Sequence, residues 1–203
     1  MSRYFKRKKN EEPEVIKIVV DGSPYSGKST LINTYLKKNV DYYYAPGDYA
    51  IRKKNIIHKG KNYNLEIWDI SHRQLKTCFL KRYYSSASGF ILTCDTSNET
   101  LTQLDKKYND MRQGCIGNVP IILVFTKSDM EKEFDYNKFN KYAANKKMKT
   151  LSSGMKITEA EQVFNTLVSE IVSKDLFWKV EEEKKTIIKL KSVLASPKIS
   201  YCF

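Results

Sequence analysis

Short apolar runs along the chain are separated by stretches in which apolar residues recur with helical spacing. Six of these runs predict strands: Val15–Asp21, Asn55–Lys59, Asn64–Ile70, Gly89–Cys94, Ile121–Phe125 and Met148–Leu151. The second and third flank Gly60 and are expected to form a hairpin. Others are apolar almost throughout, which is typical of strands buried on both faces of a sheet.

Helical segments alternate with these strands. They are predicted at Gly27–Lys38, Arg73–Tyr84, Asn98–Gln113, Asp135–Lys146 and Ala160–Val172. Gly114 and Gly117 are interpreted as stop signals for the third helix. The alternation predicts an α/β fold, a mostly parallel sheet covered by helices on both faces.

Composition narrows the class of protein. A chain of 203 residues with 41% hydrophobic residues fits one folded domain. Its apolar runs are far shorter than the roughly 20 residues that cross a bilayer, and no secretory signal is expected. Four cysteines without a CxxC pair, and only two His, argue against a zinc site or a disulfide framework. They favour the reducing cytoplasm.

The net charge is +13, from 36 Lys and Arg against 23 Asp and Glu. Such a charge suits nucleic acid, an anionic membrane or a phosphate ligand. The charge is mostly scattered Lys, which a Lys-rich composition explains equally well, so no specific nucleic-acid partner is expected.

Both ends of the chain differ from the alternating unit of residues 15–174. Residues 1–14 are basic and then acidic without periodicity, which favours a solvated arm over a membrane or nucleic-acid contact. Residues 175–203 suggest a helical extension that either packs back onto the domain or binds a partner.

The segment Gly22–Ser29 reads GSPYSGKS and matches the phosphate-loop pattern GxxxxGK[ST] between a strand and a helix. Its backbone N–H groups would form an anion nest, and Lys28 would add a charge for the β- and γ-phosphates. The Ser29 hydroxyl is placed to ligate Mg²⁺. A structural glycine turn is the weaker interpretation.

A second motif distinguishes between nucleotide classes. Residues Thr126–Asp129 read TKSD and follow the most apolar strand, about 100 residues after the phosphate loop. They resemble the [NT]KxD motif of GTPases, in which the Asp carboxylate accepts hydrogen bonds from guanine N1–H and the exocyclic amine, and the Lys stem packs over the base. Ligands bind at the carboxyl ends of strands in open α/β sheets, which strengthens the match.

With these motifs, residues 15–174 resemble a Ras-superfamily small GTPase, closest to the Rab branch. Trp68–Ile70 resembles the family's WDT segment, Tyr83 and Tyr84 precede a Rab-like run at Gly89–Leu92, and Ser153–Met155 stands where the family has SAK. Thr158–Ile171 matches its last helix. The resemblance implies a G-domain with a six-stranded sheet and about five helices, binding GTP or GDP with Mg²⁺ and switching between two conformations.

The resemblance also implies a set of site residues. Asp69 would hold Mg²⁺ through a water molecule, beside the direct ligand Ser29. The nucleotide-binding set comprises Gly22, Ser23, Pro24, Tyr25, Ser26, Gly27, Lys28, Ser29, Thr30, Thr126, Lys127, Asp129, Ser153, Gly154 and Met155. Effector and exchange-factor proteins would be partners, and a role in membrane traffic or signalling follows, in the cytoplasm or peripherally on an endomembrane.

The switch motifs depart from the family pattern. Gly47 stands where the first switch has the Thr that ligates Mg²⁺, and no Thr occurs between Thr34 and Thr77. His72 replaces the Gly that contacts the γ-phosphate, and Arg73 replaces the Gln that orients the attacking water. Arg73 is thus either a catalytic finger supplied in cis or a solvent-facing residue.

Two further departures concern the phosphate loop and the C-terminus. Pro24 and Tyr25 occupy loop positions that are usually small, where Pro24 removes an N–H and Tyr25 crowds the site or closes over ribose. The single Cys202 fits no standard prenylation motif and is interpreted as an incidental thiol, so membrane association would use the basic tails.

Two functional hypotheses remain open. The chain is either a Rab-like GTPase with slow hydrolysis, or a pseudo-GTPase that holds nucleotide constantly and recruits a partner. A P-loop kinase of another class is disfavoured by the TKSD motif.

Overall fold

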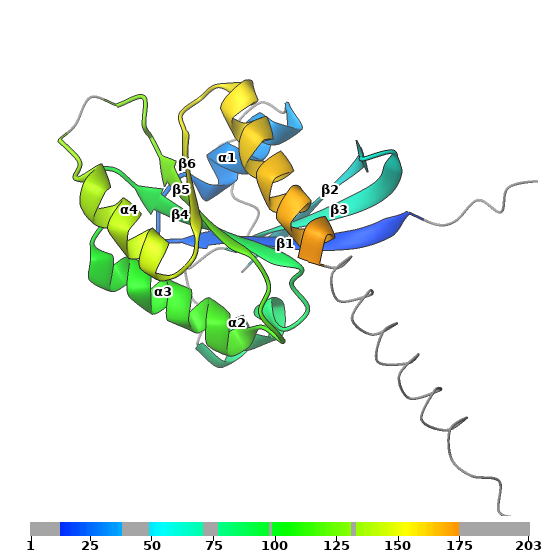
Figure 1. Ribbon diagram of the computed structural model, residues 1–203, viewed down its shortest axis with the longest axis horizontal. Helices are drawn as coiled ribbons and strands as arrows, with labels where there is room; N and C mark the ends of the chain where they lie inside the picture. Colours follow the sequence, from blue (N-terminus) through cyan, green and yellow to red (C-terminus); the bar gives the residue numbers. More distant parts are fainter. Residues whose placement is uncertain (1–12, 38–48, 71–76, 98, 131–132, 175–203) are drawn as a thin grey trace, which may run out of the picture.

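The computed structural model describes residues 13–37, 49–70, 77–97, 99–130 and 133–174. Ten of its elements alternate as the sequence predicts (Figure 1): β1 (Glu14–Gly22), α1 (Lys28–Leu36), β2 (Tyr49–His58), β3 (Lys61–Ile70), α2 (Thr77–Tyr84), β4 (Gly89–Asp95), α3 (Leu101–Gly114), β5 (Ile121–Thr126), α4 (Tyr136–Asn145) and β6 (Lys149–Ser153). A further helix covers residues 157–174 and is called the C-terminal helix below. No helix in the described ranges is long and apolar enough to span a bilayer.

The sheet has six strands in the order β2-β3-β1-β4-β5-β6. All neighbouring pairs are parallel except β2 and β3, which form the predicted antiparallel hairpin. The hairpin turns at Lys59 and Gly60, both with positive φ, which Gly adopts without steric cost. The mostly parallel α/β architecture is therefore confirmed, with β1 in the centre.

Two hydrophobic cores lie on opposite faces of the sheet. On one face, α1 and the C-terminal helix cover Ile18, Leu65 and Val124, while on the other α2, α3 and α4 cover Val19, Phe90 and Leu123. Neighbouring residues of β1 point to opposite faces, and both are fully buried because helices cover each side. The apolar stripe predicted over Ala160–Val172 supplies the C-terminal helix's contribution.

The boundaries of several elements differ from the sequence prediction. The third helix begins at Leu101 rather than at Asn98, because the Thr100 side chain accepts from the Gln103 N–H and Gln103 caps Thr100 in return. Strand β2 begins at Tyr49, six residues before the predicted start, and pairs with β3 along its whole length. Strand β1 begins at Glu14, which the sequence assigned to the tail.

Candidate functional site

The predicted phosphate loop connects β1 to α1 at the carboxyl end of the central strand. A Cβ at Gly22 would lie 2.1 Å from Thr93 Oγ1, so the close approach of β1 to β4 excludes a side chain there. Gly27 is the N-cap of α1 with φ 79°, a conformation that favours glycine. These two glycines let the loop turn sharply into a helix N-terminus, the arrangement that binds phosphate.

Lys28 lies within this loop. Its ammonium donates to Ser23 O at 2.8 Å and to Gly22 O at 3.4 Å, and the residue is only 7% exposed. Burial lowers the pKa of Lys28, while the negative charges of Asp21 and Asp69 oppose this shift. Phosphate oxygens would favour the charged form further, because they add negative charge beside a desolvated ammonium.

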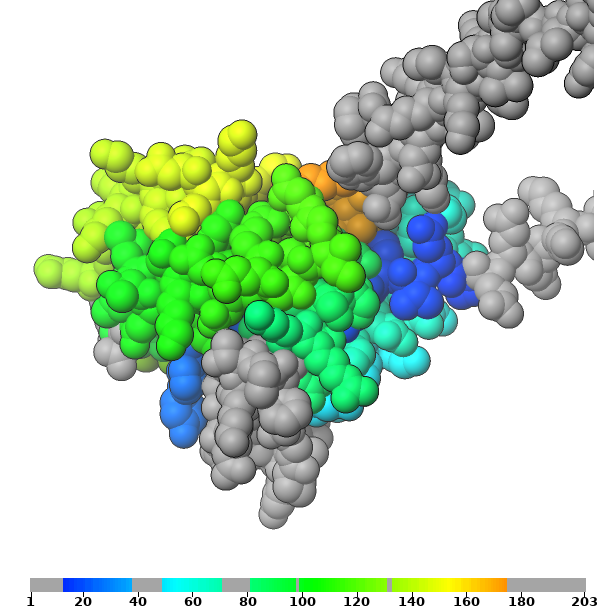
Figure 2. All heavy atoms as spheres, turned by 90° about the horizontal axis from the view of Figure 1, so that it is seen from below, coloured from blue at the N-terminus to red at the C-terminus, as the bar shows by residue number. Residues whose placement is uncertain are grey.

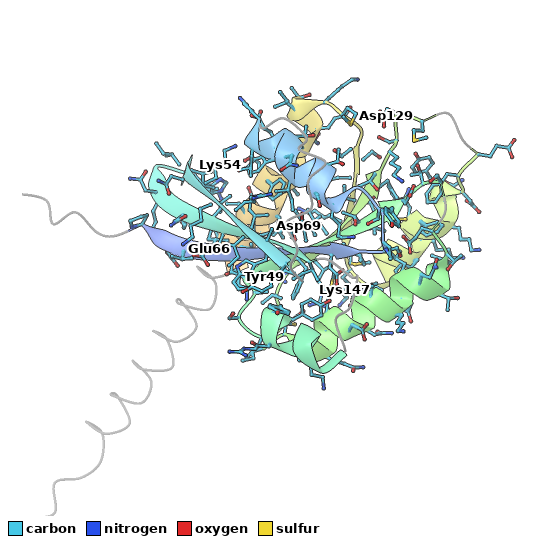
Figure 3. The ribbon with its side chains drawn as sticks, turned by 180° about the vertical axis from the view of Figure 1, so that it is seen from behind. Tyr49, Lys54, Glu66, Asp69, Asp129 and Lys147 are labelled. Carbon is cyan, nitrogen blue, oxygen red and sulfur yellow. The ribbon has the colours of Figure 1, made fainter. Side chains whose placement is uncertain are left out.

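The predicted metal ligands are brought together. The Ser29 hydroxyl hydrogen-bonds the Asp69 carboxylate at the end of β3, beside α1 (Figure 3). Burial raises the pKa of Asp69, and the Ser29 hydroxyl and the Lys28 charge counteract that rise. A hydroxyl and a carboxylate are hard oxygen donors of the kind that Mg²⁺ prefers, so the residues present fit this ion.

Thr126 connects the TKSD segment to the phosphate loop by a hydrogen bond. Its hydroxyl is positioned to donate to Ser26 O at 2.8 Å in the phosphate loop and to Cys94 O at 3.1 Å at the end of β4. Thr126 is buried, so these contacts replace the hydration that its hydroxyl and the two carbonyls lose. One side chain thereby fixes the distance between the phosphate loop and the TKSD segment.

A cavity of about 230 Å³ joins three separate motifs. It is lined by Gly27, Thr30, Leu31, Thr126, Lys127, Asp129, Met130, Ser153, Gly154 and Met155. Some predicted residues from each of the three segments thus meet around one space, with Leu31 and Met130 as additional walls that the sequence analysis missed. Asp129 is exposed at the rim, where a carboxylate can contact a base edge (Figure 3).

Gly154 allows the third segment to approach Asp129. A Cβ at Gly154 would lie 3.0 Å from Asp129 Cβ, so any larger residue would press on that side chain. The Gly154 N–H donates to Glu159 Oε2 at 2.7 Å, which anchors the segment to the start of the C-terminal helix. Glu159 was not singled out from the sequence, although an acidic residue in the first turn of a helix often has such a role.

The Lys127 ammonium is paired with a residue that is not part of the cavity lining. It donates to Asp95 Oδ2 at 2.6 Å, and Asp95 Oδ1 accepts from both the N–H and the hydroxyl of Ser97. Although burial favours the neutral carboxyl, these hydrogen bonds lower the pKa of Asp95. Lys127 itself is a lining residue of the cavity. Asp95 was missed, although it ends a buried strand as Thr126 does.

Pro24 and Tyr25 are the two residues of the phosphate loop that are unusual for the family. Tyr25 has φ 61°, a strained conformation for a residue with a side chain, and the residue is 75% exposed. Its side chain is therefore largely exposed to solvent. Pro24 beside it is also exposed.

Two predicted loop residues, Ser23 and Ser26, contact Glu99 and Thr93, which were not singled out from the sequence. The Ser23 hydroxyl donates to Glu99 Oε1 at 2.6 Å, and Ser26 Oγ lies 2.6 Å from Thr93 Oγ1. Burial raises the pKa of Glu99, with the Ser23 hydrogen bond opposing the shift.

The switch positions lie outside the described residues. They are Gly47, His72 and the predicted catalytic residue Arg73. Among the described residues there is no cluster of three or more His, Cys, Asp or Glu side chains that would form a separate metal site.

Comparison with known proteins gives a consistent assignment. The Ras family model matches residues 17–173. The Ras-related protein RabL of Dictyostelium discoideum is 30% identical over 124 residues, which are 59% of this chain and 60% of RabL. RabZ of the same organism is 23% identical over 185 residues, covering 88% of this chain and 80% of RabZ. Human Rab-4B is 27% identical over 167 residues, covering 79% and 78%.

This chain thus spans only about three fifths of RabL. The Ras family model, by contrast, matches most of this chain, residues 17–173. The six-stranded sheet and the cavity shared by the phosphate-loop and TKSD segments agree with that match. The chain belongs to the Ras family of small GTPases.

Proposed function

We propose that this protein is a Rab-like guanine-nucleotide switch in which GTP hydrolysis and γ-phosphate sensing are impaired. The observation that carries the proposal is a contrast within one chain. The groups expected to bind nucleotide converge around the phosphate loop and the 230 Å³ cavity, whereas the family's switch residues are replaced by Gly47, His72 and Arg73.

The proposed binding of guanine nucleotide rests on the phosphate loop and the TKSD segment. The loop N–H groups and Lys28 would hold the phosphates, and Asp129 would accept two hydrogen bonds from guanine. Ser29 directly and Asp69 through a water molecule would hold Mg²⁺, which neutralises phosphate charge when it is bound. The Thr126 bridge to Ser26 supports simultaneous binding of base and phosphates, because it fixes their two sites relative to each other.

The proposed impairment of hydrolysis rests on the chemical groups that this chain has at the switch positions. Gly47 has no hydroxyl for Mg²⁺, and Arg73 has no acceptor oxygen to orient an attacking water. His72 retains a backbone N–H but brings a bulky side chain to a position that is Gly in the family. Hydrolysis should therefore be slow, and GTP binding should change the conformation of the two switches only weakly.

Recruitment of a partner, which the pseudo-GTPase alternative requires, is supported by a cluster of aromatic side chains. Tyr49 stacks on Trp68 with ring centroids 5.1 Å apart, and Tyr83 lies 4.9 Å from Tyr49. Tyr49 is 42% exposed, and within the described residues the buried Trp68 Nε1 has no hydrogen-bond partner. Such a surface suits an effector protein, since aromatic residues dominate protein interfaces.

The cellular role follows from the Rab-type relatives and the basic tail. We propose a role in membrane traffic or signalling, with the protein in the cytoplasm or peripherally on an endomembrane and regulated by effector and exchange-factor proteins. The basic residues of the N-terminal tail would contribute to any membrane contact.

The experiment that tests this proposal identifies and counts the nucleotide released from purified protein on denaturation, then follows single-turnover hydrolysis of bound GTP. Guanine nucleotide with slow conversion to GDP supports the slow GTPase. GTP that persists unchanged supports the pseudo-GTPase. Rapid conversion would overturn the impaired-hydrolysis proposal, and the absence of nucleotide together with no GTP binding would overturn both.

Two variants sharpen the assay. In the Arg73→Ala protein, a fall in rate would identify Arg73 as a finger supplied in cis, and an unchanged rate would place it outside catalysis. Arg73→Gln should not restore a normal rate by itself, because Gly47 still lacks the switch hydroxyl.

A further inference from the structure

A second cavity, of about 690 Å³, lies at the end of the sheet opposite the nucleotide site. Ile121 and Lys149, the first residues of β5 and β6, line it, whereas the nucleotide cavity is lined by Thr126 and Ser153, the last residues of those strands. Helix α3 and the C-terminal helix form its other walls. Figure 2 shows α3 bordered by the residues that follow α4.

Five basic side chains line this cavity, which we call the basic groove: Arg112, Lys146, Lys147, Lys149 and Lys174. Glu170 is the one acidic residue of its lining. The groove volume falls in the range of small-molecule sites. An excess of positive charge within a concave surface is a property that anionic ligands require.

The acidic neighbours neutralise only two of these five cations. Lys146 pairs with Asp105 at 3.0 Å, and Lys149 pairs with Glu170 at 3.0 Å. Within the described chain, Lys147 has no ion-pair partner and is exposed, and Figure 3 shows it well away from Asp129.

Arg112 and Lys174 converge on one short loop and contact only neutral groups there. Arg112 Nη1 donates to Val119 O at 2.7 Å and Asn118 Oδ1 at 3.2 Å, and Lys174 donates to Asn118 O at 3.1 Å. Burial lowers the pKa of Lys174, the positive charge of Arg112 lowers it further, and the negative charge of Glu170 opposes the shift. Two cations are thus held close together at some electrostatic cost, which an anion between them would remove.

The Arg112 guanidinium is also fixed in orientation. Its Nε donates to Tyr108 Oη at 3.2 Å, and its carbon lies 5.3 Å from the Tyr108 ring centroid. Its hydrogen bonds within the described chain use Nε and Nη1, which leaves Nη2 for a ligand. A guanidinium held in place loses little side-chain entropy when an anion binds.

We propose that the basic groove binds a small, multiply charged phosphate compound through Arg112, Lys147 and Lys174. Phosphate fits because it presents several acceptor oxygens to donors that converge from α3, the end of α4 and the C-terminal helix. The ligand is either free in solution or the phosphorylated headgroup of a membrane lipid, since both present the same chemistry. This site is separate from the phosphate loop and lies at the opposite ends of the strands.

The test uses the full chain saturated with GDP and Mg²⁺, so that the phosphate loop is already occupied. Isothermal titration with inositol trisphosphate, and separately with inorganic pyrophosphate, measures binding to the groove. Flotation with phosphatidylcholine vesicles containing phosphatidylinositol bisphosphate measures binding of the same headgroup in a membrane. The groove variant is Lys147→Gln with Lys174→Gln, and the matched control is Lys53→Gln with Lys106→Gln, which loses the same charge outside the groove.

The parent should bind inositol trisphosphate with an affinity that falls as salt is added, and the groove variant should bind on the order of tenfold or more weakly. The control should differ by less than about twofold, because distant exposed charges are screened. Vesicle binding that falls in the groove variant alone would identify the lipid headgroup as a source. Vesicle binding that is equal in both variants, with inositol trisphosphate still sensitive, would identify a soluble compound.

Two results would overturn the proposal. One is a parent protein that binds neither inositol trisphosphate nor pyrophosphate. The other is equal weakening in the groove variant and the control, which would show a response to net charge rather than a site. Both variants should retain GDP, since neither alters the residues around the nucleotide cavity.

Discussion

The Tyr84 hydroxyl donates a hydrogen bond to the Asp21 carboxylate directly behind the phosphate loop. Both residues are fully buried, and the other Asp21 oxygen accepts from the Gly22 N–H at 2.6 Å and lies 3.7 Å from the Lys107 ammonium. This carboxylate therefore links α2 and α3 to the first residue of the loop. The burial and the nearby negative charge of Asp21 raise the pKa of Tyr84, which keeps its proton on the donor.

Tyr84→Phe should lower the free energy of unfolding by about 1–3 kcal/mol, because it leaves a buried carboxylate short of one donor. Urea unfolding at a fixed GDP concentration measures the change. Tyr142→Phe is the matched control, because its hydroxyl also donates to a carboxylate, that of Asp105 at 2.9 Å, but Asp105 is partly exposed. Equal losses in the two variants would contradict a special role for the Asp21 pair.

Thr126→Val should lower both stability and GDP affinity, because the carbonyls of Ser26 and Cys94 lose their shared donor. A cost of about 1–3 kcal/mol is expected for buried acceptors left unpaired. Thermal unfolding and GDP titration measure the two effects. Thr126→Ser keeps the hydroxyl and should retain most of the affinity. If the Ser variant behaved like the Val variant, packing of the methyl group, rather than the hydrogen bond, would be responsible.

Lys127→Met should change how stability depends on pH. Since the pKa of Asp95 is lowered in the folded state, its ion pair stabilises the fold above the unfolded pKa of about 3.9 and is lost as pH falls further. The variant should be less stable than the parent near neutral pH, and the difference should shrink on acidification below about pH 4.

Unfolding at a series of pH values and a fixed GDP concentration measures this difference. Asp95→Asn serves as the control, because it removes the titrating group and should flatten the same part of the profile. A parent–variant difference that stays constant from neutral pH to well below pH 4 would show that Lys127 stabilises the fold independently of the Asp95 charge.

Asp129→Asn should weaken GTP binding by about 1–3 kcal/mol or more, because a charge-assisted pair of hydrogen bonds to guanine is lost. Competition binding with GTP and ATP measures the preference, and the parent should favour GTP. Asp110→Asn, on α3 outside the nucleotide cavity, should leave GTP affinity unchanged. Equal affinity of the parent for ATP and GTP would refute guanine recognition by Asp129.

GDP and a non-hydrolysable GTP analogue should bind with similar affinity. A ligand shifts a conformational equilibrium only through its different affinities for the two states, and the γ-phosphate contacts of the family are weakened by Gly47 and His72. Hydrogen exchange across Asp41–Ala50 should therefore be alike with the two nucleotides. Strong extra protection with the GTP analogue would reveal a working switch and count against impaired sensing.

The order and type of the elements follow from local sequence. Uninterrupted apolar runs such as Ile121–Phe125 are typical of strands in a covered parallel sheet, and the structure confirms that placement. The phosphate loop and the TKSD segment were also recognisable, because each depends on consecutive residues whose spacing the backbone enforces. The start of β2 was less predictable, since its pairing with β3 determines it, whereas the Thr100–Gln103 cap is a local pattern that the sequence analysis missed.

The sequence by itself determined the alternation of strands and helices and two local motifs, the phosphate loop and the TKSD segment. Periodicity and short spacing depend only on residues that are close together along the chain. Only the tertiary structure decided contacts between distant residues, such as Thr126 with Ser26 and Lys127 with Asp95. Gly114 illustrates the difference. It was expected to stop α3 and is indeed the helix's last residue, but the structure adds a second reason for glycine there: a Cβ would lie 2.6 Å from Tyr84 Cδ2. No local pattern encodes that contact, because its partner belongs to another helix.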